Sequence, residues 1–413
     1  MKENRDFIVG GIHKFQQKHQ LPWSDITVGI AGDLMKTLAG QKVLYSKPLP
    51  DYALFMPENM ADAEKILAEF AALGCPVDRD EISSKPGVVL WIYVFSLKVP
   101  VTKGPFPAIK EPEGWHNPLV NRRKLESAAL PGEMTPLVFK NERYRLENVM
   151  AHFLTPGAES HSRPTSEYHF RIRRVANDTL ISIPLMNHYF ASGYVKDDFC
   201  YCFATNLGEG GKSLSMIRSD DLISWEKIRR VLDLRKEQIS ICNTGVTFDG
   251  SRYVMLYECN DPAYPIFTFK FLASDDLTDW QPIEGAIYGA DKYVGGPALY
   301  WSCGYYYVTY VDLFIHPTVR QVCFRTSISR SRDLIHWEDA PEERAVVMPD
   351  FSNRPNPEYF PEVYDVNASD AEFIEEDGKV KVFFIGGNQW GVSDNQVAEY
   401  NGTADQLFQE FFK

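Results

Sequence analysis

A heptapeptide that occurs three times constrains this chain more than any other feature. It reads Ser-Asp-Asp-Leu-Ile-Ser-Trp at 219–225, Ser-Asp-Asp-Leu-Thr-Asp-Trp at 274–280 and Ser-Arg-Asp-Leu-Ile-His-Trp at 331–337, at steps of 55 and 57 residues. Self-similarity at a period of this size is typical of one supersecondary unit repeated in a stack or a ring. We therefore expect most of the chain to be an array of such units.

Alternating apolar and polar residues surround the heptapeptides. A pair of strand-like runs separated by a turn can be found five times, at 135–139 with 143–147, 188–194 with 199–206, 243–248 with 253–258, 295–300 with 305–312, and 369–374 with 380–388. Antiparallel four-stranded units with tight hairpins at this spacing are typical of a β-propeller. The sequence thus predicts a mainly β fold with a five-bladed β-propeller over residues 131–413, closed by an outer strand from before residue 135.

The heptapeptide itself is interpreted as structural. Its aspartate suits the turn that enters the outermost strand of a blade, because Asp side chains accept hydrogen bonds from nearby backbone amides. Its tryptophan is large enough to fill the wedge between neighbouring blades. We expect Trp225, Trp280 and Trp337 to lie there.

The first hundred residues have a different periodicity. Residues 61–73 place Ile66, Leu67, Phe70 and Leu73 on one helical face, and Gly74 follows as a stop signal. Strand-like runs lie at 26–31, 52–56 and 88–97, and proline and glycine are dense over 100–118. We predict a small α/β domain over 1–100, which is structural or mediates a homo-oligomer, and a linker over 101–130 that contains the ring-closing strand.

Charge and composition exclude several classes of function. The formal net charge is −13 and there is no extended basic cluster, which argues against binding to nucleic acid. The longest apolar run, 88–97, is too short to span a membrane, and the charged N-terminus lacks the apolar core of a signal peptide. Seven cysteines lie scattered within strand-like runs, which is typical of reduced thiols. A cytoplasmic location without membrane contact is expected.

In a propeller, the first strand of each blade starts on the face where the second strand ends. Polar residues at these positions should therefore converge on one rim. The strand starts are Thr135, His188, Asn243, Gly295 and Asp370, and the strand ends are Glu147, Asn206, Glu258, Asp312 and Asn388.

Carboxylates gathered at such a rim suit glycoside hydrolysis, which needs one protonated and one ionised carboxyl group. We expect Glu258 and Asp370 to be the main acid/base pair, with Glu147 as a third catalytic carboxylate. Substrate-binding roles are expected for Asp312, His188, Asn243 and Asn388, and for Arg163 in the long loop 147–168. No catalytic metal or cofactor is predicted.

The repeated heptapeptides and the Tyr-rich second strands, such as Gly304-Tyr-Tyr-Tyr-Val308, resemble the five-bladed propeller glycoside hydrolases of families 43, 32, 68 and 117 over residues 131–413. The resemblance implies a carbohydrate substrate. Family 43 keeps acids at inner-strand starts, where this chain has Thr135, Asn243 and Gly295-Gly296-Pro297. Family 117 implies a histidine acid, for which His188 and His316 are both candidates. The resemblance also implies a structural calcium or a water in the central channel, and His188 and Asp370 as its ligands stay an open alternative.

Two classes of function follow. The first is an exo-acting glycoside hydrolase with a carboxylate acid/base mechanism. The alternative is a non-catalytic carbohydrate-binding propeller, which the replaced family 43 acids would allow. A third hypothesis, an interaction protein that acts through residues 1–100, would need an exposed basic or apolar face there.

Overall fold

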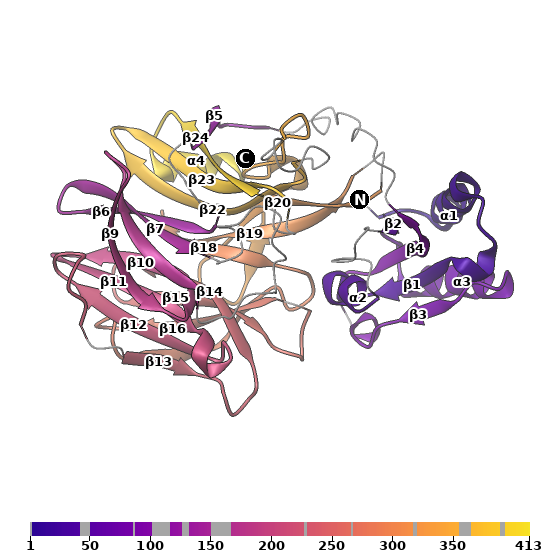
Figure 1. Cartoon of the computed structure of the whole chain (residues 1–413), viewed down its shortest axis with the longest axis horizontal. Helices are drawn as coiled ribbons and strands as arrows, with labels where there is room; N and C mark the ends of the chain where they lie inside the picture. The colour runs from indigo at the N-terminus through magenta and orange to yellow at the C-terminus, as the bar shows by residue number, and fades with distance from the viewer. Residues whose placement is uncertain are drawn as a thin grey trace.

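A computed structural model of the chain describes residues 2–41, 50–85, 87–100, 116–125, 132–149, 167–226, 229–265, 267–316, 320–354, 365–388 and 393–413. This part of the chain is mainly β, as predicted. Figure 1 shows a small set of helices and strands at the N-terminus beside a larger body of strands. In the ranges given, no helix has both the length and the apolar character that crossing a membrane requires.

The first hundred residues form one four-stranded sheet with helices, here called the N-terminal unit. Its elements are α1 (Arg5–His19), β1 (Thr27–Ala31), α2 (Leu34–Gly40), β2 (Pro50–Phe55), α3 (Met60–Ala72), β3 (Val77–Arg79) and β4 (Trp91–Pro100), with the strand order β2-β4-β1-β3. The helix predicted over 61–73 is α3, which begins at the cap Asn59 and buries Ile66 and Phe70. Helix α1, which the sequence analysis did not predict, buries Ile8, Ile12 and Phe15.

The rest of the described chain forms antiparallel strands in five consecutive groups. They are β6 (Met134–Phe139), β7 (Glu142–Val149), β8 (His169–Arg174) and β9 (Thr179–Met186); β10 (His188–Lys196), β11 (Phe199–Asn206), β12 (Ser213–Ser219) and β13 (Arg229–Asp233); β14 (Ser240–Phe248), β15 (Tyr253–Asn260), β16 (Thr268–Ser274) and β17 (Gln281–Tyr288); β18 (Gly295–Ser302), β19 (Tyr305–Ile315), β20 (Val322–Ser331) and β21 (Trp337–Asp339); and β22 (Asn367–Glu376), β23 (Lys379–Gly387) and β24 (Ser393–Tyr400) with β5 (Val120–Lys124). Nine of the ten predicted runs lie inside the corresponding strands, and the run 380–388 passes the end of β23 by one residue.

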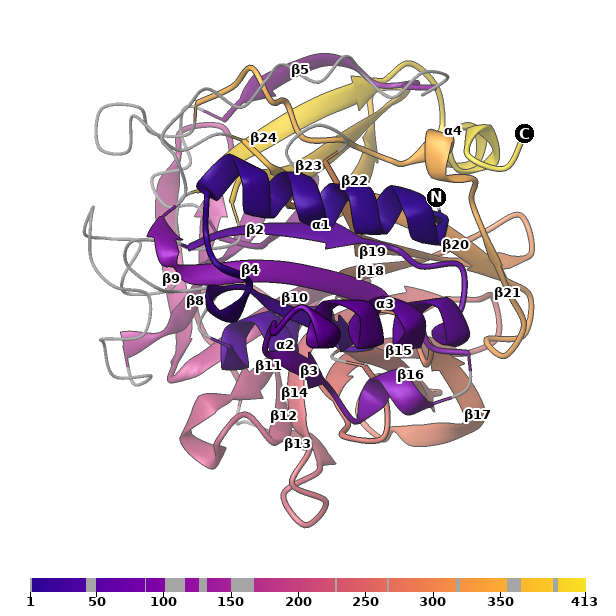
Figure 2. The same cartoon turned by 90° about the vertical axis from the view of Figure 1, so that its right-hand side faces the viewer.

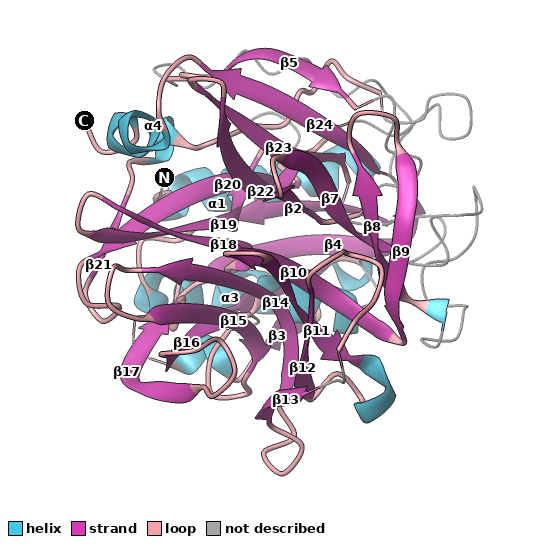
Figure 3. Cartoon of the chain, turned by 90° about the vertical axis from the view of Figure 1, so that its left-hand side faces the viewer, coloured by secondary structure: helices cyan, strands magenta, loops and turns pink. Residues whose placement is uncertain are grey.

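The first strands of the five groups contact one another in a ring. Strand β10 contacts β6 and β14, β18 contacts β14 and β22, and β22 contacts β6. Strand β5 pairs antiparallel with β24 as the outer strand of the last group. A single parallel bridge, between Phe324 and Asn367, joins the fourth and fifth groups into one larger sheet. Figure 3 shows the strand groups arranged around this ring.

The heptapeptides lie at the outer edges of their groups. The Oδ1 atom of Asp276 accepts hydrogen bonds from the amides of Thr278 (2.8 Å) and Asp279 (2.9 Å), and Asp221 and Asp333 hold their own turns in the same way. The ring of Trp280 packs edge-on to Phe203 of the preceding group, with centroids 5.8 Å apart. Each aspartate therefore fixes a turn, and the tryptophan fills the space between neighbouring groups.

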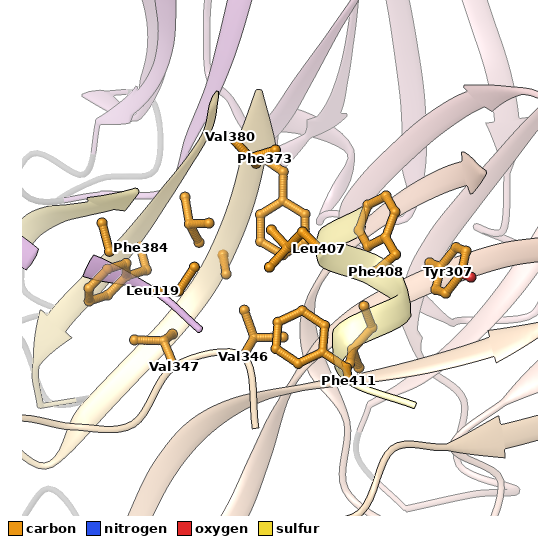
Figure 4. Packing of buried hydrophobic residues seen from close by; sticks show 14 of the residues in the cluster. Leu119, Tyr307, Val346, Val347, Phe373, Val380, Phe384, Leu407, Phe408 and Phe411 are labelled. Atoms are coloured by element: carbon orange, nitrogen blue, oxygen red, sulfur yellow. The ribbon is translucent and has the colours of Figure 1, made fainter. Parts of the chain in front are cut away.

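Apolar clusters hold neighbouring groups together. In the cluster between the fourth and fifth groups, helix α4 (Ala404–Glu410) inserts Leu407 and Phe408 against Tyr307 and Phe373. Figure 4 shows these side chains converging from strands and helix. Phe408 stacks on Tyr307 with centroids 4.6 Å apart. The C-terminal helix therefore fills this wedge with aromatic side chains.

Candidate active site

The innermost strands are irregular at the same level of the ring. The pairing of the first with the second strand shifts register within 189–192 of β10, 241–244 of β14, 295–298 of β18 and 369–372 of β22. Three of these segments contain a residue with positive φ, which are Phe190 (53°), Gly296 (50°) and Asp370 (57°). A β-bulge bends its strand and re-aims a side chain, and such strain is common at functional sites. The bulges therefore mark one end of the ring as the candidate site.

A pocket lies at this level, with a volume of about 310 Å³ counted out to its open mouth. All five strand groups contribute to its wall. The polar lining residues are Glu133 and Thr135 from the start of β6, Asn148 from β7, Ser192 from β10, Asn243 and Thr244 from β14, and Asp370 and Glu372 from β22, while Gly296 and Pro297 line it from β18. A concave site with convergent polar groups is the usual form of a small-molecule site.

Three carboxylates line the pocket and a fourth lies behind its wall. Asp370 and Glu372 are both on β22, two residues apart, and both line the pocket. Glu133 comes from the turn before β6. Glu258, on β15, is buried and accepts hydrogen bonds from Asn243 Nδ2 (3.2 Å) and from the amide of Gly296 (3.0 Å). Asn243 Nδ2 also donates to Glu133 (3.4 Å), so one amide nitrogen bridges two carboxylates.

The remaining hydrogen bonds differ among the carboxylates. Glu372 accepts from the hydroxyls of Tyr300 (3.0 Å) and Thr135 (3.4 Å), and Asp370 accepts from Ser369. The second oxygen of Glu133, Oε2, is buried without a hydrogen-bond partner in the described part of the chain. A buried carboxylate oxygen without a donor is costly when ionised, so this geometry favours the protonated form of Glu133.

Burial raises the pKa of every carboxyl group in this cluster. The pKa of Glu133 lies well above its ordinary value because of burial and the charges of Asp370, Glu258 and Glu372. Burial raises the pKa of Glu258 to about 8 and that of Glu372 to about 8. Burial raises the pKa of Asp370 only to about 6, since the hydrogen bond from Ser369 lowers it. Asp370 therefore ionises at a lower pH than Glu258 and Glu372.

Glu147, expected to be catalytic, lies in a different environment. Its neighbour Asn148 reaches the pocket and exchanges two hydrogen bonds with the backbone of Ala191. Adjacent residues of a strand point to opposite faces. Glu147 therefore points away and is buried against two arginines, accepting from Arg145 Nε (2.9 Å) and Arg171 Nε (2.8 Å).

Of the residues expected to bind substrate, some line the pocket and others do not. Asn243 lines the pocket. Asp312, near the end of β19, accepts from Arg325 Nη2 (2.7 Å) and Nε (2.9 Å), and it is not among the lining residues. His188 is buried, with Nδ1 3.0 Å from the Met186 carbonyl and Nε2 3.1 Å from the Ser215 hydroxyl; burial lowers its pKa. Its two ring nitrogens are thus held by the protein itself.

Asn388 directly follows β23, is half-buried and does not line the pocket. Arg163 lies outside the described residues. The sequence analysis missed Glu133, Glu372 and Asn148. Glu133 stands two residues before the assumed strand start Thr135, and Glu372 two residues after Asp370, so a wider window around each strand start would have included both acids.

Metal binding was also considered for the carboxylates. Across the described ranges, no group of three or more His, Cys, Asp or Glu side chains is placed to hold a metal ion. The channel calcium that the sequence analysis left open therefore stays a prediction.

Comparisons with known proteins gave matches among solved structures. No family model matches the chain, and no curated protein matches it. The chain is similar to the GH43 protein BlXynB from Bacillus licheniformis, at 14% identity over 69% of this chain and 55% of that one, with a TM-score of 0.45. It is similar to a putative glycoside hydrolase from Parabacteroides distasonis, at 11% identity over 73% and 96% of the two chains, with a TM-score of 0.46.

A third similar structure is the α-L-arabinofuranosidase PaAbf62A from Podospora anserina in complex with cellotriose, at 11% identity over 68% of this chain and 94% of that one, with a TM-score of 0.46. These solved structures are glycoside hydrolases, the group that the sequence resembles. Identities and scores this low transfer no residue role. The assignment of function below therefore rests on the pocket.

Proposed function

We propose that this chain is a glycoside hydrolase that removes the terminal sugar of a carbohydrate. The proposal includes the architecture: the five strand groups are the blades of a five-bladed propeller over residues 131–413, and the N-terminal unit is a separate small domain. The observation that carries the function is the convergence of Glu133, Asp370 and Glu372 on one pocket.

Two of these groups suit the two roles that the reaction needs. Asp370, with a pKa of about 6, is ionised at neutral pH and would attack the anomeric carbon or take a proton from the attacking water. Glu133, whose pKa is raised by burial and by its acidic neighbours, would give its proton to the leaving oxygen as the glycosidic bond breaks. Different environments thus separate two similar groups into base and acid.

Glu258, proposed from the sequence as the partner of Asp370, has a different part in this scheme. It lies behind Asn243 and Gly296 and is not among the lining residues. We assign it a positioning role, because it accepts from Asn243, the side chain that also donates to Glu133. Once Glu258 ionises, above about pH 8, its charge also raises the pKa of Glu133.

Removal of a terminal sugar suits the size of the pocket. The space of about 310 Å³ includes the solvent at its open mouth, so the enclosed part of the pocket is smaller than this value. One sugar ring fits such a space better than several. An exo-acting enzyme is therefore the form of hydrolase that we propose.

The test is a panel of aryl glycosides and natural oligosaccharides, assayed with the wild type and three variants. Asp370→Asn and Glu133→Gln should each lower kcat at least ~100-fold on the best substrate. Asp312→Asn is the matched control, since Asp312 is a carboxylate near the end of β19 that does not line the pocket. It should keep turnover within about 3-fold, because Asp312 is bonded to Arg325 and does not reach the pocket, and asparagine keeps an acceptor oxygen for that arginine.

Full turnover in both pocket variants would refute the assignment. Calorimetric binding of an oligosaccharide, with no sugar released by the wild type, would instead support the carbohydrate-binding propeller. One observation supports that alternative: Glu372 already accepts hydrogen bonds from the hydroxyls of Tyr300 and Thr135, so it has a structural role within the protein.

A further inference from the structure

We propose that the N-terminal unit is a fixed wall over the end of the ring that holds the pocket, and that it confines the enzyme to chain ends. This inference rests on the proposed function. It goes beyond it by naming the part of the molecule that makes the reaction specific for a terminus.

The sheet of the N-terminal unit is buried on both faces. On β4, Ile92 and Val94 pack with the helices α1 and α3. Trp91, Tyr93 and Phe95 point to the opposite face, where they join a cluster with residues of β19 and β20, namely Val311, Leu313, Val322 and Phe324. The face that a second subunit could have used is therefore taken by the strand ring of the same chain.

Arg320 anchors this interface. Its guanidinium donates to the Leu54 carbonyl from Nη2 (2.8 Å) and pairs with Glu3 (2.7 Å). It also lies 4.9 Å from the centroid of the Phe55 ring. The Arg320 carbonyl accepts from the Leu54 amide (2.9 Å), so β2 is fixed at its backbone as well. A half-buried arginine with an ion pair, hydrogen bonds and a ring contact gives a well-defined position.

Two further contacts reach the loops of the third and fourth strand groups. The Val89 amide donates to the carbonyl of Asp291 in the loop before β18 (2.9 Å), and Lys85 Nζ donates to the carbonyl of Ala263, which follows β15. Strand β15 ends and β18 begins at the level of the pocket. The N-terminal unit is thus attached at the same end of the ring as the carboxylates.

The interface cluster reaches the wall of the pocket itself. Val311 belongs to the cluster and pairs with Gly295, and its side chain lies 3.0 Å from the position of a Cβ atom built on Gly296. Phe324, also in the cluster, pairs with Asn367 on the strand that carries Asp370. Figure 1 places the N-terminal unit beside the ring, and Figure 2 looks onto it and shows it in front of the strands.

The opposite side of the pocket has different chemistry. There, the first two strand groups contribute Asn148 and Ser192, and an aromatic cluster of Tyr168, Tyr189 and Phe190 lies close by. The hydroxyl of the buried Tyr189 lies 4.0 Å from the position of a Cβ atom built on Gly132, the residue before Glu133, so the cluster lies beside this wall of the pocket. Phe190 is the partly exposed ring of the cluster, and an aromatic ring beside polar groups suits the apolar face of a sugar. We infer that the carbohydrate chain leaves the pocket on this side, and that the N-terminal unit stops it on the other.

A chain that cannot pass across the pocket can only present its end. The test compares two forms of the best oligosaccharide of the panel, one with a free terminus and one with the terminal sugar methylated so that only internal bonds can be cut. Arg320→Ala should loosen the wall and raise the ratio of internal to terminal cleavage at least ~10-fold, while turnover of a small aryl glycoside stays within about 3-fold.

Arg332→Ala is the matched control, because Arg332 also stacks on an aromatic ring, Tyr305 at 4.1 Å, but in the heptapeptide at an outer edge. It should leave the ratio unchanged. Lys85→Ala removes one exposed contact and cannot unfold the chain, so it provides a milder second variant that should shift the ratio in the same direction. Hydrogen exchange of the Leu54 amide reports whether the wall has loosened.

If the Leu54 amide exchanges faster in Arg320→Ala but the ratio of internal to terminal cleavage is unchanged, the proposal that the N-terminal unit confines the enzyme to chain ends is refuted. Calorimetric binding of the two oligosaccharides tests the role of the N-terminal unit separately from the proposed hydrolase activity, because it does not require any sugar to be released. Even if the wild type releases no sugar, the methylated oligosaccharide should bind the wild type less tightly than the oligosaccharide with a free terminus. Arg320→Ala should remove this difference in affinity. Equal binding of both chains to the wild type would refute the wall.

Discussion

Replacing Glu258 by glutamine should stabilise the protein at neutral pH. The Glu258 carboxylate is buried, and in the described part of the chain its donors are Asn243 and the Gly296 amide, with no lysine or arginine bonded to it. Burial raises its pKa from 4.5 to about 8. Glutamine keeps an acceptor oxygen for both donors and has no proton to bind. The substitution therefore removes a titration with little change of shape.

The size of the effect follows from linkage between protonation and folding. At low pH, the folded and unfolded forms both carry the proton. As the pH rises above 4.5, the unfolded chain loses the proton while the folded protein keeps it until about pH 8. Over this range, the titration of Glu258 lowers the free energy of unfolding of the wild type by about 1.4 kcal/mol per pH unit. From pH 5 to pH 7 this amounts to about 3 kcal/mol, which the variant does not lose.

The assay is urea unfolding of the wild type and Glu258→Gln near pH 5 and near pH 7. The stability of the variant relative to the wild type should rise between the two by about 3 kcal/mol. Asp220→Asn is the control, since Asp220 is exposed in a heptapeptide and should give no pH-dependent difference. A difference that does not change with pH, or one that falls as the pH rises, would show that the burial of Glu258 does not control its protonation.

Three further predictions concern the pocket and the blade edges. Gly296→Ala should lower kcat at least ~10-fold, because the new Cβ would lie 2.2 Å from Asp370 Oδ1, whereas Gly250→Ala, at a positive φ with no atom within 4 Å, should leave kcat unchanged. As the pH increases, kcat/KM should rise through about pH 6 as Asp370 ionises and fall at higher pH as Glu133 ionises. Glu258→Gln should move this fall to lower pH, because it removes a charge that raises the pKa of Glu133. Trp280→Ala should destabilise the fold by about 3–5 kcal/mol in urea unfolding, because its buried ring fills a wedge.

The strand pairs could be predicted because their signal is local. Alternation and turn residues specify each hairpin without reference to the rest of the chain, so the runs 253–258 and 305–312 lie within the strands β15 and β19. The heptapeptides then supplied the spacing. Helix α1 was missed although its apolar positions Ile8, Ile12 and Phe15 have the i, i+4, i+7 spacing of an amphipathic helix, so this part of the sequence does carry a helical signal.

The site was harder to predict, because the direction of a side chain depends on register. A shift of one residue moves a side chain to the other face of its strand. Glu147 and Asn148 show the effect, since the amide lines the pocket and the acid is paired with arginines. Asp370 and Glu372, two residues apart on β22, share the pocket as plain alternation allows, but the pairing of β22 with β23 is interrupted there by the bulge at 369–372. Alternation in the sequence carries no signal for such a bulge.

The positions where family 43 keeps its acids bear on whether this chain is active. By the resemblance, Thr135, Asn243 and Gly295 stand at the positions of those acids. The Thr135 hydroxyl donates to Glu372, Asn243 donates to Glu258, and the amide of Gly296, next to Gly295, donates to Glu258. Neutral groups at or beside these positions are thus hydrogen-bond donors to acids on neighbouring strands. Four carboxylates crowded without a described cation would cost stability to no purpose in a scaffold. We take their number and their raised pKa values as support for the proposed hydrolase over the carbohydrate-binding alternative.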